Sequence, residues 1–336
     1  MNSEHPLIGV TLGDPSSIGP EVIGKALAAG RVYDKVRPLV IGSKAILDRE
    51  IARLGLNLNM NTVVEPGAGI YKPGTIDIFN IDNIAPDVPY GEVSAVGGRA
   101  CYEYIEKSIE LALAGKIDGV ATAPIHKQAI HMAGIEYIGH TEIFAGLTGS
   151  PDVIVFFHVN KMRIFFLSRH MSLRHSIDYI TRANVLKSIE QTYSAMKFIG
   201  YDNPRIAIAA LNPHASDDGL YGDEEKKELT PAIRDAVAKG INAFGPAPAD
   251  TVFLMFESGK CDAVLSLYHD QGHIAAKVHD VFKTVAVTIG LPFIRATVDH
   301  GTAMDIAGKG IASPISMEEC LLVTGQYVSK HKKSNL

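Results

Sequence analysis

Three histidines follow short apolar runs of the chain. His170 comes after RIFFLSR, His214 after RIAIAALNP and His269 after AVLSLY. If each run is a strand of a parallel sheet, the imidazoles gather beyond the carboxyl ends of the strands, where open α/β sheets bind ligands. Three imidazoles and an open coordination position form a recognised catalytic metal site. The residues therefore predict a divalent-metal centre, against an alternative in which each histidine belongs to an ordinary loop.

Two basic residues lie near these histidines in the sequence. Lys277 comes eight residues after His269, in HDQGHIAAK. A nearby metal ion disfavours the charged form of a lysine and so tunes it toward acid–base chemistry. Arg295, in GLPFIRATVDHGTA, follows an apolar strand and has the fork geometry that suits carboxylate or phosphate. The alternative for Lys277 is a solvated helix lysine, and Asp299 and His300 of the second motif could be an ordinary loop pair. Together the residues favour a small anionic substrate.

Two further motifs adjoin expected helices. GHTE, residues 139–142, precedes a helical pattern, and Thr141 is the expected N-cap of a helix whose free N–H groups could bind an anion. Plain helix capping is an equal alternative. LGDPSSIGPE, residues 12–21, matches neither G-x-G-x-x-G nor the Walker P-loop, so a structural β–α turn is favoured over a nucleotide site.

Composition narrows the class of protein. The chain has 336 residues, 46% hydrophobic and 21% charged, with a formal net charge of −5, which predicts neither a nucleic-acid nor a membrane partner. Three widely spaced cysteines argue against a disulfide framework and favour a reducing compartment. No secretory signal and no run of transmembrane length is found, so a cytoplasmic setting is expected.

Short apolar runs alternate with longer helical patterns, which predicts an α/β fold with mainly parallel sheets. The expected strands are Leu7–Leu12, Pro38–Ile41, Gly119–Ala123, Val153–His158, Arg163–Ser168, Arg205–Leu211, Ala263–Leu267 and Thr284–Ile289. The expected helices are Glu21–Ala29, Ala45–Leu54, Val93–Ala114, Ile177–Ile199, Lys226–Ala238, Thr251–Ser258 and Ser316–Lys330. Residues 151–170 break the rhythm and predict an antiparallel hairpin at an edge or interface. With no flexible tether, residues 1–336 are expected to form one unit of two interleaved lobes with uncertain boundaries.

Six motifs together carry a family resemblance. GDPSSIGPE, GHTE, LNPHA, PADT, YHDQG and GLPFIRATVDHGTA occur in this order between residue 13 and about residue 310. They resemble the 4-hydroxythreonine-4-phosphate dehydrogenase family. The resemblance implies a fold like those of isocitrate and isopropylmalate dehydrogenases, and a homodimer with its active site at the subunit interface. It also implies NAD or NADP as cofactor, bound without the G-x-G-x-x-G fingerprint.

The resemblance also implies roles for individual positions. His170, His214 and His269 match the ligands of one divalent metal, which the sequence leaves open as Zn, Mg, Mn or Co. Substrate contacts are implied for His140, Thr141, Lys277 and Arg295. Asp250 and Pro292 fall in motifs near the cofactor, and Asp270 lies beside the site. Lys277, or water relayed through Asp270, is the expected general base.

One position departs from the vitamin B6 enzymes of this family. Where they carry a substrate-contacting Asn, the strand Thr284-Val-Ala-Val-Thr-Ile289 has Ala286, which offers no side-chain hydrogen bond. This is similar to the branch that oxidises 4-phospho-D-threonate or 4-phospho-D-erythronate, which carry a hydroxyl in place of the amine. The expected reaction is oxidation at C3 followed by loss of CO2, which would give dihydroxyacetone phosphate from the erythronate.

Three other functions stay open at this point. The first is 4-hydroxy-L-threonine-4-phosphate dehydrogenase of pyridoxal phosphate biosynthesis. The second is a metal-dependent hydrolase or lyase that uses the same histidines without a nicotinamide. The third is a non-catalytic sensor of a phosphorylated acid, which the presence of Lys277 and all three histidines disfavours.

Overall fold

A computed structural model describes residues 5–334 and divides into two compact units. Unit 1 comprises residues 5–153 and 285–332, and unit 2 comprises residues 154–284. The chain leaves unit 1 after Val153 and returns to it at Val285. Each unit has its own strands and helices.

Unit 1 is built on a mostly parallel sheet whose central strands are buried. Its strands are β1 (Leu7–Thr11), β2 (Arg37–Gly42), β3 (Asn59–Thr62), β4 (Thr75–Asn80), β5 (Gly119–Thr122), β11 (Val285–Ile289) and β12 (Ile294–Val298). They follow the order β3-β4-β2-β1-β5-β12-β11, and the β11–β12 pair alone is antiparallel among the pairings described for this unit. All residues of β1, β5 and β11 are buried, as expected for strands covered on both faces.

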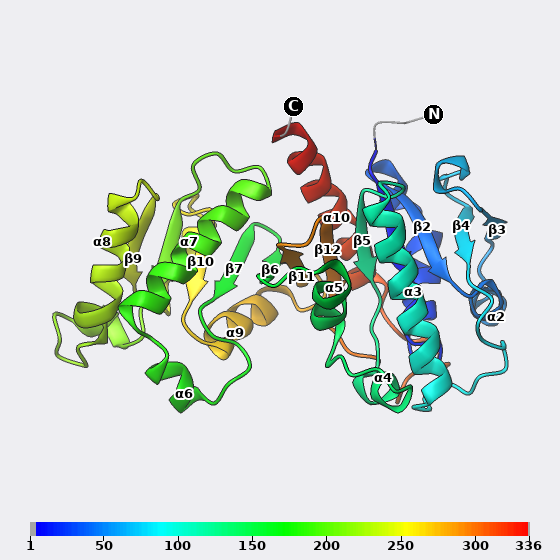
Figure 1. The fold of residues 1–336 in the computed structure, drawn as a ribbon, viewed down its shortest axis with the longest axis horizontal. Coiled ribbons are helices and arrows are strands. Elements are labelled where there is room, and N and C mark those ends of the chain that lie inside the picture. The colour runs from blue at the N-terminus through cyan, green and yellow to red at the C-terminus, as the bar shows by residue number, and fades with distance from the viewer. Residues whose placement is uncertain (1–4, 335–336) are drawn as a thin grey trace. The chain divides into compact units, whose positions relative to one another are not determined.

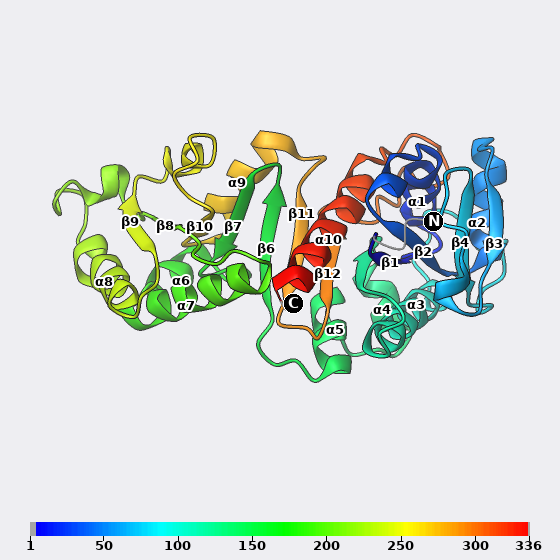
Figure 2. The ribbon, with the colours of Figure 1, turned by 90° about the horizontal axis from the view of Figure 1, so that it is seen from above.

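The helices of unit 1 cover both faces of this sheet. They are α1 (Gly19–Ala28), α2 (Lys44–Leu54), α3 (Ala95–Leu113), α4 (Lys127–Met132), α5 (His140–Thr148) and α10 (Ile315–Ser334). Helices α1 and α10 lie on one face and α3 on the other (Figure 2). Capping serines mark two of the helix starts: Ser43 accepts from the Ile46 N–H and Ser94 from the Gly97 N–H.

Unit 2 contributes five strands, with helices on both faces of them. Its strands are β6 (Ile154–Val159), β7 (Met162–Phe166), β8 (Ile206–Ala209), β9 (Ala243–Ala247) and β10 (Ala263–Ser266), in the order β6-β7-β10-β8-β9. Its helices are α6 (Leu173–Asp178), α7 (Arg182–Phe198), α8 (Thr230–Ala238) and α9 (His269–Asp280). Helices α7 and α8 cover one face and α9 the other (Figures 1 and 2).

Close packing holds α9 against the sheet of unit 2. A Cβ on Gly272 would lie 2.5 Å from a Phe166 ring carbon and 2.8 Å from the Ser266 Oγ. A larger residue would therefore push the helix away from β7 and β10. Because α9 begins at His269, this glycine sets how closely that imidazole approaches the sheet.

The fold class predicted from sequence is confirmed, and so is the hairpin. Strands β6 and β7 are antiparallel around Asn160, which has φ 50°. Strand β7 is not an edge, since it pairs with β10 on its other side. Four strands were not predicted, because their apolar runs are short or partly polar: β3, β4, β9 and β12.

Two helix predictions were wrong. The expected helix Ile177–Ile199 is divided into α6 and α7, because Thr181 is extended and its hydroxyl caps α7 by accepting from the Asn184 N–H. The expected helix Thr251–Ser258 is reduced to one 3-10 turn, Val252–Met255. Its β-branched and aromatic residues have modest helix propensity, and the stretch is short.

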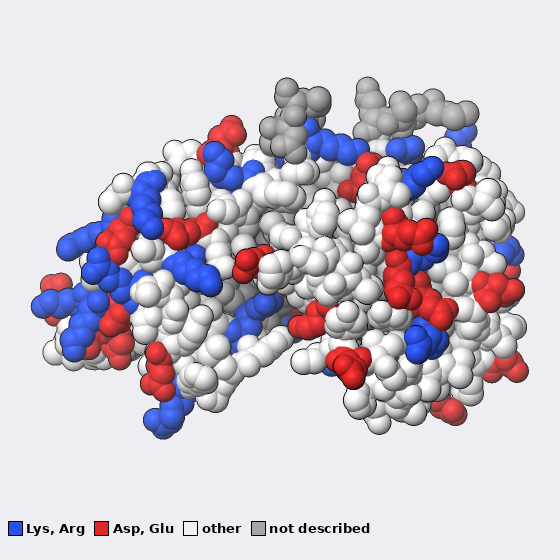
Figure 3. Space-filling model, in the orientation of Figure 1, with Lys and Arg blue, Asp and Glu red and all other residues white. Residues whose placement is uncertain are grey.

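The surface of unit 2 carries both signs of charge. Lys, Arg, Asp and Glu are interspersed over α7 and α8 (Figure 3). Ion pairs join these helices at Arg182–Asp235, 2.6 Å, and Lys239–Glu190, 2.5 Å. Within residues 5–334, none of the helices combines the length and hydropathy that a bilayer crossing requires.

Candidate active site

A pocket of about 510 Å³ opens in unit 2 where β7 and β10 end. Its lining residues are Arg169, His170, Met171, Leu173, Ser176, Tyr268, His269 and Asp270. The strands carry these residues to one place because Phe166 and Ser266 are register partners. Beyond the strands, the Leu167 N–H donates to the Ser266 carbonyl at 2.8 Å, so the two chains stay side by side as they enter the pocket.

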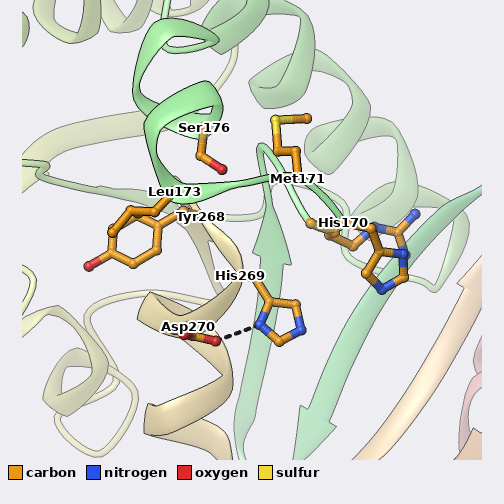
Figure 4. Close-up of a pocket in the computed structure, with 8 residues that line it drawn as sticks. His170, Met171, Leu173, Ser176, Tyr268, His269 and Asp270 are labelled. Carbon is orange, nitrogen blue, oxygen red and sulfur yellow. Dashed lines mark hydrogen bonds and ion pairs between the residues drawn. The ribbon is translucent and has the colours of Figure 1, made fainter.

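His170 and His269 lie together in this pocket. Their ring centroids are 6.2 Å apart, with an angle of 42° between the rings (Figure 4). Two imidazoles on one tetrahedral ion, with metal–nitrogen bonds of about 2.0–2.1 Å, have centroids roughly 5 Å apart. A shift of about 1 Å would therefore bring the pair to ligating distance, and the donor chemistry suits a divalent metal.

Asp270 holds the imidazole of His269. Its Oδ1 lies 2.7 Å from the His269 Nδ1. An ionised carboxylate accepts a proton-bearing Nδ1, which leaves the lone pair on Nε2 for a ligand. The ring of His273 stacks on that of His269, with centroids 3.5 Å apart and 12° between planes. Burial lowers the pKa of His273 to about 4, so this stacked ring is neutral and does not repel a cation.

Gln271 joins the ends of β8 and β10, a role that was not predicted from the sequence. Its Nε2 donates to the carbonyl of Ala210 at 2.8 Å, and its Oε1 accepts from the Leu267 N–H at 2.7 Å. One amide thus links the segment after β8, which leads to His214, with the segment after β10, which leads to His269. Its place inside YHDQG, directly after His269 and Asp270, was the available signal.

His214 lies in a left-handed turn and not directly at a strand end. Strand β8 ends at Ala209, and five successive non-glycine residues, 214–218, have φ between 46° and 73°. Left-handed backbone costs L-residues about 1–2 kcal/mol each, so surrounding contacts must stabilise this turn. The ring of His214 has its centroid 6.3 Å from that of Tyr221. Across residues 5–334, no set of three or more His, Cys, Asp or Glu side chains is arranged to hold a metal ion.

The other predicted residues of unit 2 have different surroundings. Lys277 is exposed on α9, and the positions 269, 273 and 277 share one helical face because they are spaced by four. The axial rise from His269 to Lys277 is about 12 Å, at roughly 1.5 Å per residue. Asp250 is exposed in the loop after β9.

In unit 1, Arg295 is buried beside His140. The guanidinium is 1% exposed and donates to two hydroxyls, Thr122 at 2.8 Å and Thr288 at 3.3 Å. It lies over the Phe144 ring, 5.2 Å from the centroid. Burial lowers the pKa of Arg295 to about 10, which leaves it charged at neutral pH.

Both residues present a buried nitrogen that no described residue satisfies. These atoms are the Nε of Arg295 and the Nε2 of His140. Burial, and then the charge of Arg295, lowers the pKa of His140 well below its usual range, so the imidazole is neutral. A buried polar group without a partner costs about 1–3 kcal/mol, which an anionic ligand would relieve.

Helix α5 begins at His140, two residues before the start that an N-cap at Thr141 predicts. Gly139 is the N-cap of α5, and it makes no side-chain cap hydrogen bond. The prediction that Thr141 is the N-cap was therefore wrong. Thr141 instead lies in the first turn, where the N–H groups have no intrahelical partner and attract anions.

Ala286 belongs to the same face of the sheet as Arg295. Directly opposed residues of antiparallel strands share a face, and the register opposes Ala286 to Thr297 and Thr288 to Arg295. On this face of the sheet, the pair Ala286–Thr297 is therefore the neighbour of the pair Thr288–Arg295. Pro292 is exposed in the turn between β11 and β12.

The glycine- and proline-rich turn after β1 is buried and makes hydrogen bonds within unit 1. Residues 12–18 are buried, and the Asp14 N–H donates to the Pro124 carbonyl at 3.0 Å. The Oδ1 of Asp14 accepts from the Ser16 N–H at 3.0 Å, and burial raises the pKa of this carboxyl.

Comparison with known proteins places these features in a family. Residues 34–324 match the family model described as pyridoxal phosphate biosynthetic protein PdxA. A relative from Symbiobacterium thermophilum, provisionally named D-threonate 4-phosphate dehydrogenase, is 48% identical over 331 residues, 98% of this chain and 99% of the relative. A relative from Clostridium botulinum with the same provisional name is 43% identical over 334 residues, 99% of this chain and all of the relative.

A solved structure agrees with this assignment. The crystal structure of 4-hydroxythreonine-4-phosphate dehydrogenase from Klebsiella pneumoniae has a TM-score of 0.90 and 36% identity. The match covers 98% of this chain and 100% of the solved chain. The fold is therefore the isocitrate dehydrogenase-like fold of this family.

The neutral state of His140 can be tested by titration. We expect its imidazole signals in NMR spectra to keep the neutral position below about pH 6.5, where the imidazole of a free histidine becomes protonated, since burial and Arg295 disfavour the charged form. The unfolded chain takes up this proton near pH 6.5, so the contribution of His140 to stability is present above that pH and is lost as the pH falls below it. His140→Gln identifies the signals, and a midpoint near 6.5 would contradict the assignment.

Proposed function

The chain belongs to the PdxA family of pyridoxal phosphate biosynthetic proteins, and we propose that it is an NAD- or NADP-dependent dehydrogenase of a small phosphorylated 3-hydroxy acid. The observation that carries this proposal is the buried pair Arg295 and His140, each with an unsatisfied nitrogen. A permanent positive charge beside a neutral imidazole donor suits a phosphate or carboxylate group. Thr141, in the first turn of α5, adds an anion-attracting N–H.

The substrate that we favour is 4-phospho-D-threonate or 4-phospho-D-erythronate. Ala286 supports this choice because it lies one residue pair from Arg295 and has no polar atom to meet an amine. The provisional names of the relatives from Symbiobacterium and Clostridium point the same way. The alternative substrate is 4-phosphohydroxy-L-threonine, which the solved Klebsiella relative is named for.

For a divalent metal, we propose His170, His214 and His269 as ligands. The facing pair in unit 2 supports the first and third, and Asp270 prepares the His269 ring by holding its Nδ1. A bound divalent ion would polarise the oxygen at C3 and favour both its deprotonation and the loss of CO2. Zn, Mg, Mn and Co all remain compatible with imidazole ligands.

The reaction that we propose has two steps. The hydroxyl proton at C3 passes to Lys277, or to water relayed through Asp270, as the C3 hydride passes to the oxidised nicotinamide, the second substrate. The 3-keto acid then breaks its C1–C2 bond, releases CO2 and takes up a proton at C2. Phosphoerythronate would give dihydroxyacetone phosphate, and the amino acid would give an amino-ketone phosphate. Lys277 shares the helical face of His269, which supports its role.

We propose in addition a homodimer with its active site at the subunit interface. An apolar stripe on α9 supports this: Ile274 is 62% exposed, Val278 82% and Val281 49%. These positions repeat at the spacing of one helix face. A second copy of the chain that covered these apolar side chains would bury them on the same helix that begins at His269.

The substrate is tested by NADH or NADPH formation with metal-loaded protein and three substrates in parallel. We expect turnover of 4-phospho-D-erythronate or 4-phospho-D-threonate and weak or no turnover of 4-phosphohydroxy-L-threonine. Ala286→Asn should raise kcat/KM for the amino acid by about fivefold relative to the sugar acids, since one hydrogen bond is worth about 1 kcal/mol. Turnover of the amino acid alone would refute the preference, and no turnover of any of the three would refute the proposed function.

The metal ligands are tested by titration of metal-free protein with Co²⁺ and Zn²⁺ in a calorimeter. His170→Ala and His269→Ala should each weaken binding by at least about tenfold, because each removes one donor. His279→Ala, on the exposed end of α9, is the matched control and should leave binding unchanged. Equal affinities for all four proteins would exclude these two histidines as ligands.

The dimer is tested by light scattering and sedimentation. The chain of 36.1 kDa should behave as a species of twice that mass, and Val278→Asp should shift it toward monomer because a buried carboxylate is costly. Lys239→Asp, an exposed change elsewhere in unit 2, should leave the dimer intact. A monomeric parent protein would contradict the proposal.

A further inference from the structure

Glu225 is a buried carboxylate directed at the segment that leads to His214. It is 3% exposed and begins the π-helical turn Glu225–Leu229, a feature that is frequent at functional sites. Its Oε1 accepts from the main-chain N–H groups of Leu211 at 2.8 Å and Asn212 at 2.7 Å. Its Oε2 accepts from the Asn212 side chain at 2.8 Å.

These donors come from the point where the chain leaves the sheet. The Ala210 N–H still pairs with strand β9, through the Ala247 carbonyl at 2.8 Å, but the next two N–H groups have no strand partner among the described residues. An ionised carboxylate satisfies both of them with charge-assisted hydrogen bonds. Glu225 thereby closes the base of the loop 211–225.

The loop that Glu225 closes contains the left-handed turn 214–218. Inside the loop, the Ser216 hydroxyl donates to the Gly222 carbonyl, and the Tyr221 N–H donates to the Ser216 carbonyl at 3.2 Å. A Cβ on Gly222 would lie 2.6 Å from the Asn212 Nδ2, so this glycine lets the Asn212 amide reach Glu225. The carboxylate of Glu225 therefore anchors the segment that enters the strained turn, and the bonds of Ser216 within the loop hold the turn itself.

We propose that Glu225 is a positioning residue, which holds the left-handed turn and so sets the direction of the His214 imidazole. It touches neither substrate nor cofactor and acts through the loop. The inference deepens the proposed function, because it rests on that proposal for the role of His214. A residue of purely structural importance would affect stability alone, and its loss would leave the conformation of the loop unchanged below the unfolding temperature.

The test compares Glu225→Gln with Glu224→Gln. The amide oxygen that Glu225→Gln introduces can still accept from the main-chain N–H groups of Leu211 and Asn212. The new NH2 group, however, faces the side-chain NH2 of Asn212, and two donors cannot form a hydrogen bond. Glu224 accepts a hydrogen bond from the same Asn212 amide at 2.7 Å, which makes it the matched control. Three quantities are measured below the unfolding temperature: hydrogen exchange of residues 211–222, Co²⁺ affinity and kcat/KM.

In Glu225→Gln we expect exchange in residues 211–222 to quicken, with no change in residues 263–268. Co²⁺ affinity and kcat/KM should each fall by about tenfold or more, the range for residues that orient metal ligands. Ala215→Gly removes the left-handed penalty at one position of the turn and should partly restore both quantities in the double variant. Exchange and affinity equal to those of Glu224→Gln would overturn the inference.

Two further outcomes separate this inference from the proposed function. If Glu225→Gln does not fold, Asn212→Ala keeps the main-chain hydrogen bonds and should show a smaller change of the same kind, whose absence would overturn the inference. If the parent protein oxidises no phosphorylated acid while the exchange in Glu225→Gln quickens and the Co²⁺ affinity falls, the proposed function fails and the positioning role stands.

Discussion

The structure of unit 2 depends on one constraint: a chain that leaves a buried sheet must find new partners for its N–H and carbonyl groups. After β8 and β10 these partners are side chains. Gln271 satisfies the Ala210 carbonyl and the Leu267 N–H, and Glu225 satisfies the N–H groups of Leu211 and Asn212. The same hydrogen bonds that remove the cost of unpaired backbone groups also set the paths of the segments that carry His214 and His269.

In unit 1 the main constraint is the burial of a full positive charge, that of Arg295. The guanidinium of Arg295 would be costly in an apolar sheet, and two threonine hydroxyls and the face of Phe144 offset part of that cost. One of its nitrogens is left without a described partner, as is one of His140. An anion-binding site needs hydrogen-bond donors that are already held in place and still lack an acceptor, so that the anion can supply it.

The two units divide the proposed chemistry between them. Unit 1 carries the residues proposed to bind the anion and the position proposed to select between hydroxyl and amine, while unit 2 carries Lys277 and the three histidines proposed to bind the metal. Sequence motifs for both are scattered along the chain, because the second unit is inserted between β5 and β11 of the first. Separate elements can thus tune substrate choice at Ala286 and the metal ligands at His170 and His269 without changing each other.

The sequence by itself determined the α/β class, the family and the residues able to carry the chemistry, because apolar periodicity and rare functional groups are local signals. It located the strands that precede His170 and His269, and the structure brings these two together in one pocket. It could not show the left-handed turn at His214, since no glycine marks residues 214–218 and the segment that enters the turn is hydrogen-bonded to the distant Glu225. Tertiary structure alone decided the roles of Gln271 and Glu225, because a buried amide or carboxylate finds its hydrogen-bond partners only when distant strands meet.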